Sequence, residues 1–180
     1  MAIRHPLDAI AEGRLRRWQL PSLAVALLCL GALPWILPGR TDHTLLDLVE
    51  AGSVAEASRV LAHWPAEHRV RVAYAVGLDY LMNPAYMNAL ALGCIWAGRA
   101  LRSTRARRVA SLLAWLAWSV VLTNAAENVG LFVALASAPA APWPLVVAGA
   151  HYWAGLVVVA CAVFLVIGLV GRMRSRRDAG

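Results

Sequence analysis

The sequence has 180 residues, of which 61% are hydrophobic, and its mean hydropathy is +0.61. Ordinary soluble domains are apolar in only about half of their residues. The composition therefore excludes that class and predicts a single all-α membrane domain, 1–180. The net charge of +7 is the excess of 17 arginines over ten acidic residues, and the sequence has no lysine. Because these arginines flank long apolar runs, they predict contacts with membrane lipids and no nucleic-acid partner.

The first apolar run, 19–38, has the length of roughly 20 residues that a helix needs to span a bilayer. It is too long for the apolar core of a signal peptide, and Pro34-Trp35 follows where a cleavage site would need small residues. We therefore expect a retained transmembrane helix. Pro21 suits its first turn, and Pro34 and Pro38 are expected to bend or end it.

The connection that follows, 40–69, is the longest segment outside the apolar runs. Thr41 or Asp42 can cap a short helix there, and Ser53 with Glu56 three residues later forms a capping box for a second helix. This pattern predicts a short helical hairpin in the first extracytoplasmic connection. A passive connector and a functional lid are both compatible with it.

Three further runs, 72–98, 109–136 and 144–171, are also long enough to cross a bilayer. The fold class expected is thus an antiparallel bundle of four transmembrane helices. The cysteines lie inside apolar runs, without a CxxC pair or a histidine at ligand spacing, which predicts buried thiols at Cys29, Cys94 and Cys161.

The arginines predict the orientation of the bundle. Thirteen of the 17 lie in the N-terminal segment, the second connection and the C-terminal tail, which share one side of the membrane if the spans alternate. The third connection, 137–143, has no charge. Arginine-rich flanks stay in the cytoplasm, so we expect a multi-pass protein of the bacterial inner membrane with both termini cytoplasmic.

Ionisable side chains inside the spans indicate a functional site. An acid at the centre of a membrane helix costs about 3 kcal/mol and usually faces the bundle interior. The acid–base candidates are Asp79, Glu127 and His151. Polar and aromatic neighbours on the same helices are the candidate ligand-binding residues: Tyr80, Asn83, Tyr86, Asn124, Asn128 and Tyr152.

These candidates are expected to meet at one depth. Counted from the outer ends of their helices at about 1.5 Å per residue, Asp79 lies about 10 Å deep, Glu127 about 13 Å and His151 about 10 Å. Three antiparallel helices would then form one polar pocket in the outer half of the bundle. Pro84 adds a kink and frees the carbonyl of Tyr80.

The remaining faces are expected to pack or to meet lipid. Trp115 lies opposite the polar residues of its helix, so we expect it to face lipid. His151 shares its face with small residues, among them Ala148 and Gly155, which suits a close contact between helices.

Two carboxyl groups and a histidine form an acid–base set that can move a proton on a hydrophobic substrate or relay protons through a carrier. One histidine and two acids on three helices lack the local spacing of a metal site. A single intramembrane histidine excludes bis-histidine haem ligation. We therefore predict no metal and no cofactor. The pattern does not distinguish an enzyme from a binding protein.

The segment from Gly77 to Tyr86, GLDYLMNPAY, and the later AAENV at 125–129 resemble a group of small uncharacterised bacterial four-helix integral membrane proteins. A more distant likeness is to the EXPERA proteins, which include the emopamil-binding sterol isomerase and the sigma-2 receptor. That resemblance implies that Asp79 and Glu127 meet a protonated amine or a carbocation-like intermediate.

The function expected is the binding or isomerisation of a small hydrophobic or isoprenoid-like ligand in the intramembrane pocket. One alternative is an accessory or structural subunit of a larger membrane complex, or a homo-oligomer. The other is a proton-coupled carrier, although four spans without repeats are few for a transporter.

Overall fold

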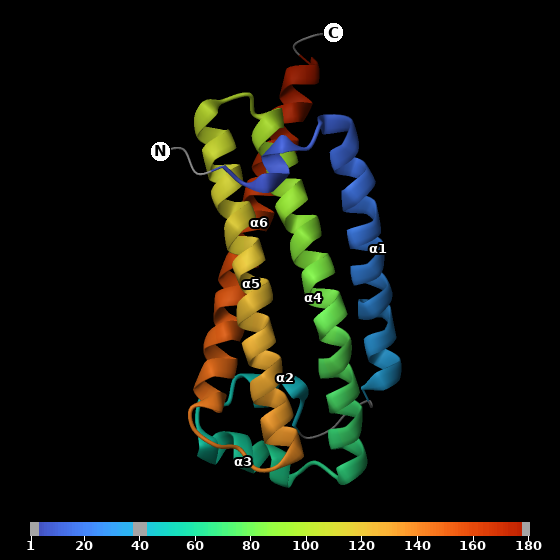
Figure 1. The fold of residues 1–180 in the computed structure, drawn as a ribbon, viewed down its shortest axis with the longest axis vertical. Helices are drawn as coiled ribbons and strands as arrows, with labels where there is room; N and C mark the ends of the chain where they lie inside the picture. The colour runs from blue at the N-terminus through green and yellow to red at the C-terminus, as the bar shows by residue number, and fades with distance from the viewer. Residues whose placement is uncertain (1–3, 38–42, 178–180) are drawn as a thin grey trace.

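The computed structural model describes residues 4–37 and 43–177, with side chains as far as residue 174. Four long helices lie side by side: α1 (Glu12–Ile36), α4 (Ala66–Ala100), α5 (Thr104–Ala136) and α6 (Trp143–Arg177). Each runs opposite to the one before it (Figure 1). The start of α1, the α4–α5 connection and the last turns of α6 therefore lie together, and we call this the arginine-rich end.

The prediction of an all-helical fold is confirmed, and the length and composition of its helices suggest a membrane protein. Three of the described helices are long and apolar enough to cross a membrane, namely α1, α5 and α6 as far as Arg174. No strand occurs in 4–37 or 43–177. The helix α4 is as long as the others, but Asp79, Asn83 and Asn88 reduce its apolar character, so its passage through the membrane stays a prediction.

The helices begin earlier than the apolar runs suggested. The first turns of α1, α4 and α5 continue into polar sequence, because a helix needs no apolar side chains where it leaves lipid. Since α1 begins at Glu12, Pro21 lies inside the helix, so its expected place in the first turn is wrong. Pro34 is also internal, and the helix ends at Ile36. The expectation for Pro38 lies outside the described residues.

Close packing holds α4 against its neighbours. A Cβ atom added to Gly98 would lie 2.5 Å from that of Ala110 on α5, and one added to Gly168 on α6 would collide with Ala97. Cys94 and Cys161 are buried free thiols in this core, and Cys29 on α1 is also a buried free thiol, which confirms the predicted burial of all three. Small residues thus set the distances between the helix axes.

A helical hairpin fills the connection between α1 and α4, as predicted. It consists of α2 (Leu45–Val49) and α3 (Val54–Ala62), at the end opposite the arginines (Figure 1). Thr44 caps α2, in place of the expected Thr41 or Asp42, which lie outside the described residues. Ser53 caps α3 as predicted, because its hydroxyl accepts a hydrogen bond from the Glu56 backbone amide at 3.3 Å. The reciprocal half of the capping box is not formed, since the Glu56 carboxylate accepts from the Ser53 hydroxyl (2.8 Å) and not from its backbone amide.

The hairpin is packed onto the bundle. Its apolar side joins a second core cluster with the ends of α4, α5 and α6, including Val60, Trp64, Val72 and Val147. The Trp64 indole also donates a hydrogen bond to the carbonyl of His43 at 2.9 Å. The hairpin therefore covers this end of the bundle.

Candidate functional site

A polar cluster joins α4 to α5. The side-chain amide of Asn128 donates hydrogen bonds to the Asp79 carboxylate (3.1 Å) and to the Asn124 side-chain oxygen (3.3 Å). The Glu127 carboxyl group lies against the Asn124 side chain and within electrostatic range of Asp79. We call these four residues the polar cluster.

Helix geometry and burial explain why the cluster forms. Residues three and four apart share one face of a helix, so Asn124, Glu127 and Asn128 all point toward α4. Their exposed fractions are 9%, 8% and 2%. Asp79 is half-buried, and Asn83, one turn further along α4, is 8% exposed. The Asn83 side-chain oxygen is buried without a hydrogen-bond partner among the described residues.

The cluster contains two carboxyl groups and no cation. The ion pair found in the described part of the chain joins Arg71 to Glu67 near the start of α4. Neither Asp79 nor Glu127 takes part in such a pair. A buried carboxylate is costly unless it is paired or hydrogen-bonded, and the amides here supply hydrogen bonds alone. The arrangement is thus suited to a ligand that brings a positive charge or a proton.

The two tyrosines of α4 have different surroundings. The hydroxyl group of Tyr80 donates to the carbonyl of Ala125 at 3.5 Å, and its ring stacks on Phe132 with centroids 6.4 Å apart. Tyr80 is therefore at the edge of the polar cluster. Tyr86 packs against the apolar core instead. The helix α4 continues through Pro84 without a break, and the kink expected there stays a prediction.

The structure does not bring His151 to the acids. Its described ring contact is with the adjacent Tyr152, at 5.8 Å between centroids, and Tyr152 is 62% exposed. In this part of α6, Val147, Ala148, Ala150 and Val157 are buried in the bundle, whereas His151 is half-buried. A role for His151 and Tyr152 at the site stays a prediction. The expected close contact through Gly155 is wrong, because an added Cβ there would meet nothing within 4 Å.

A second constellation, which the sequence did not predict, lies at the arginine-rich end. The short 3-10 helix η1 (Pro6–Ala9) crosses α4 between α5 and the start of α1 (Figure 1). The Asp8 carboxylate accepts a hydrogen bond from the Ser111 hydroxyl at 2.7 Å. Arg99 donates to the carbonyls of Asp8 (3.0 Å) and Ile10 (2.7 Å). Alternation of apolar and polar residues gives no signal for these long-range bonds.

Trp115 belongs to this constellation, although the residue is 40% exposed, which is compatible with its expected position facing lipid. His5 packs edge-on against Trp115 and Trp118, with ring centroids 4.6 and 4.3 Å apart. The Trp115 indole donates to the carbonyl of Arg4 at 3.4 Å. The N-terminal segment therefore covers part of a helix face that sequence alone assigns to lipid.

Comparisons with known proteins add no relatives to this picture. No protein-family model, no curated protein and no solved structure matches the chain. Within the described residues, no group of three or more histidine, cysteine or acidic side chains is placed to hold a metal ion. The argument for function therefore depends on the polar cluster and on the arginine-rich end.

Proposed function

We propose that the protein is a four-span protein of the bacterial inner membrane that binds, or isomerises, a small hydrophobic ligand carrying a positive charge. The observation that supports this most directly is the pairing of Asp79 with Asn128 across α4 and α5. The carboxyl groups of Asp79 and Glu127 thus lie near each other in the bundle, and no described residue forms an ion pair with either of them.

The fourth span would be α4. Its 35 residues lie among α1, α5 and α6, and the buried Asn83 and the bonded Asp79 direct polar groups toward other helices and away from lipid. A polar residue in a span is tolerated when the bundle satisfies it. The arginines at one end of the bundle would face the cytoplasm together with both termini.

Charge complementarity suggests the class of ligand. A protonated lipophilic amine, or an isoprenoid-like intermediate with a developing positive charge, would supply the positive charge that the carboxylates of Asp79 and Glu127 lack. Its apolar body would remain among the helices or in lipid. The resemblance to EXPERA proteins points to the same chemistry. A proton-coupled carrier would use the same two acids, so the experiment must separate binding from transport.

The test is ligand-dependent thermal stabilisation of the purified protein in detergent. A lipophilic tertiary amine should raise the unfolding midpoint of the wild type, because a ligand that binds only the folded state stabilises it. The Asp79→Asn and Glu127→Gln variants should fold but lose most of this shift. The matched control is Thr123→Val, since the Thr123 hydroxyl bonds only the carbonyl of Val120 in its own helix (3.1 Å).

An equal shift in the wild type and both acid variants would refute the proposal. A proton flux in proteoliposomes that depends on Glu127 would favour the carrier. Extraction in mild detergent with a stoichiometric partner protein would favour the accessory subunit.

A further inference from the structure

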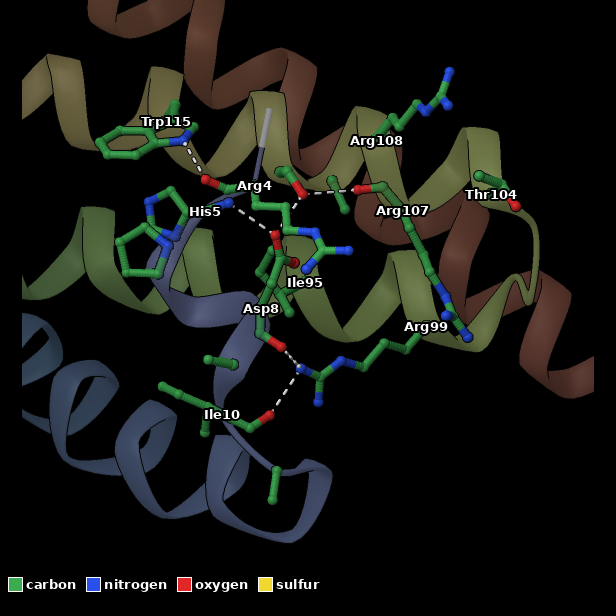
Figure 2. A pocket seen from close by; sticks show the side chains of 15 residues that line it. Arg4, His5, Asp8, Ile10, Ile95, Arg99, Thr104, Arg107, Arg108 and Trp115 are labelled. Carbon is green, nitrogen blue, oxygen red and sulfur yellow. Dashed lines mark hydrogen bonds between the residues drawn. The ribbon is translucent and has the colours of Figure 1, made fainter. Parts of the chain in front are cut away.

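A cavity of about 1030 Å³ lies at the arginine-rich end, remote from the polar cluster. Its walls come from the N-terminal segment, the last turns of α4 and the first turns of α5 (Figure 2). The polar residues that matter here are Arg4, Asp8, Arg99, Thr104, Arg107 and Ser111.

The cavity is positive, because four arginines line it and Asp8 is its one acid. The Asp8 carboxylate accepts hydrogen bonds from the His5 backbone amide (2.8 Å) and from the Ser111 hydroxyl (2.7 Å). Arg99 is held by two backbone carbonyls of the N-terminal segment. Asp8 and Arg99 therefore form part of the cavity wall, and Arg99 positions the N-terminal segment.

Two further arginines are free to meet a ligand. Figure 2 shows Arg4 reaching over Asp8 and Ile95 from the N-terminal segment, and Arg107 extending from α5 toward α4. No hydrogen bond or ion pair to protein is found for either guanidinium group among the described residues. Arg108, in contrast, points away from the cavity in this view.

An apolar groove adjoins the cavity. Trp115 forms part of the wall of both, and the groove, of about 720 Å³, continues between α1, α4 and α5 toward the middle of the bundle. Most of its lining is apolar, including Pro84, Ala85 and Leu122. A charged chamber that opens onto an apolar groove matches a ligand with an anionic head and a hydrocarbon tail.

We propose that this composite site binds a phosphate-bearing amphiphile, with the phosphate between Arg4 and Arg107 and the hydrocarbon chain in the groove beside Trp115. Guanidinium groups form paired, charge-assisted hydrogen bonds with phosphate oxygens. Basic pockets between membrane helices bind lipid headgroups in this way. The headgroup of an anionic phospholipid and a free phosphate ester share this chemistry, but only the lipid also fills the groove.

The test titrates three probes into the purified full-length protein in detergent and follows the unfolding midpoint. Dioleoyl phosphatidylglycerol should raise the midpoint, whereas the zwitterionic phosphatidylcholine and glycerol phosphate should have little effect. In the Arg4→Gln/Arg107→Gln variant, the apparent affinity for phosphatidylglycerol should fall by at least about tenfold, since two charge-assisted contacts are lost.

The matched control removes the same charge from the same end outside the cavity, as Arg102→Gln/Arg105→Gln. It should keep the wild-type affinity; an equal loss in both double variants would show attraction to the surface alone and overturn the proposal. Arg107→Gln by itself, at an exposed position, is a second variant that should fold, and it should also bind phosphatidylglycerol more weakly than the wild type does.

A variant in the groove distinguishes a phospholipid headgroup from a free phosphate ester. Ala85→Phe fills the groove and should weaken binding of phosphatidylglycerol by several-fold or more. If glycerol phosphate instead stabilises the wild type as well as the lipid does, and Ala85→Phe changes neither response, the tail has no site and the amphiphile proposal fails.

Discussion

His5 shows how one side chain controls an entire segment. Its Nδ1 atom accepts a hydrogen bond from the Leu7 backbone amide at 3.1 Å, so the ring must be unprotonated at this atom. Burial against the tryptophans lowers the pKa of His5 below its ordinary value of 6.5, and Asp8 opposes this shift only in part. The docked N-terminal segment therefore favours neutral histidine.

Docking of this segment should weaken in acid. Because the docked state holds a lowered pKa, it binds fewer protons than the released state, so docking is fully stable above pH 6.5 and loses stability as the pH falls below that value. We expect hydrogen exchange over residues 4–10 to accelerate, relative to the intrinsic rate, between pH 7.5 and 5.5.

The control for this prediction is His5→Asn, which keeps a side-chain acceptor for the Leu7 amide but cannot be protonated. Its corrected exchange rate should be independent of pH over the same interval. A wild-type rate that is equally independent of pH would contradict the role given to His5.

Between elements, glycines decide how closely the helices approach. Gly168 on α6 faces Ala97 on α4 so closely that an added Cβ would collide with it, whereas Gly155 on the same helix meets nothing within 4 Å. Overpacking a tight contact costs typically about 1–3 kcal/mol, because the helices must separate to admit the methyl group.

Gly168→Ala should accordingly lower the unfolding midpoint in detergent and loosen α6 from α4. Gly155→Ala is the matched control and should leave the midpoint unchanged or raise it slightly, because alanine favours helix more than glycine does. Equal midpoints for the two variants would mean that α6 does not pack on α4 through Gly168.

The cap of α3 gives a second prediction at the scale of elements. Ser53→Ala removes both hydrogen bonds between the Ser53 hydroxyl and Glu56 and should destabilise α3 by about 1 kcal/mol. Hydrogen exchange over residues 54–62 should then accelerate about fivefold. Ser137→Ala, which removes a hydroxyl at the end of α5 that bonds the Val133 carbonyl, should leave exchange in α3 unchanged.

For the whole molecule, the spatial separation of charge predicts its orientation. The α4–α5 connection and the start of α1 lie at the arginine-rich end, and the α2–α3 hairpin lies at the other (Figure 1). If arginine-rich flanks stay in the cytoplasm, Ser53 would be on the outside and Ser103 on the inside.

Cysteine labelling tests this orientation. In intact cells, a membrane-impermeant maleimide should react with Ser53→Cys and should reach Ser103→Cys only after the membrane is permeabilised. The three native cysteines are buried, so labelling of the wild-type protein measures the background of the experiment. The reverse pattern would invert the bundle, and labelling of both sites in intact cells would mean that α4 does not cross the membrane.

The sequence by itself determined the helical class, the C-terminal ends of α1, α4 and α5 to within two residues, the hairpin between α1 and α4, and the separation of charge. These features follow from local periodicity, caps and composition, which each segment carries independently. The sequence also identified Asp79, Glu127 and their asparagine neighbours, because polar residues are conspicuous in apolar helices.

Only the tertiary structure decided which of these groups meet. Periodicity fixes the faces of one helix but not its rotation against the next, so the bond between Asp79 and Asn128 could be expected while the different position of His151 could not. The bond from Asp8 to Ser111 joins residues 103 positions apart. Such contacts depend on how the complete chain packs, and they place the N-terminal segment over the arginine-rich cavity.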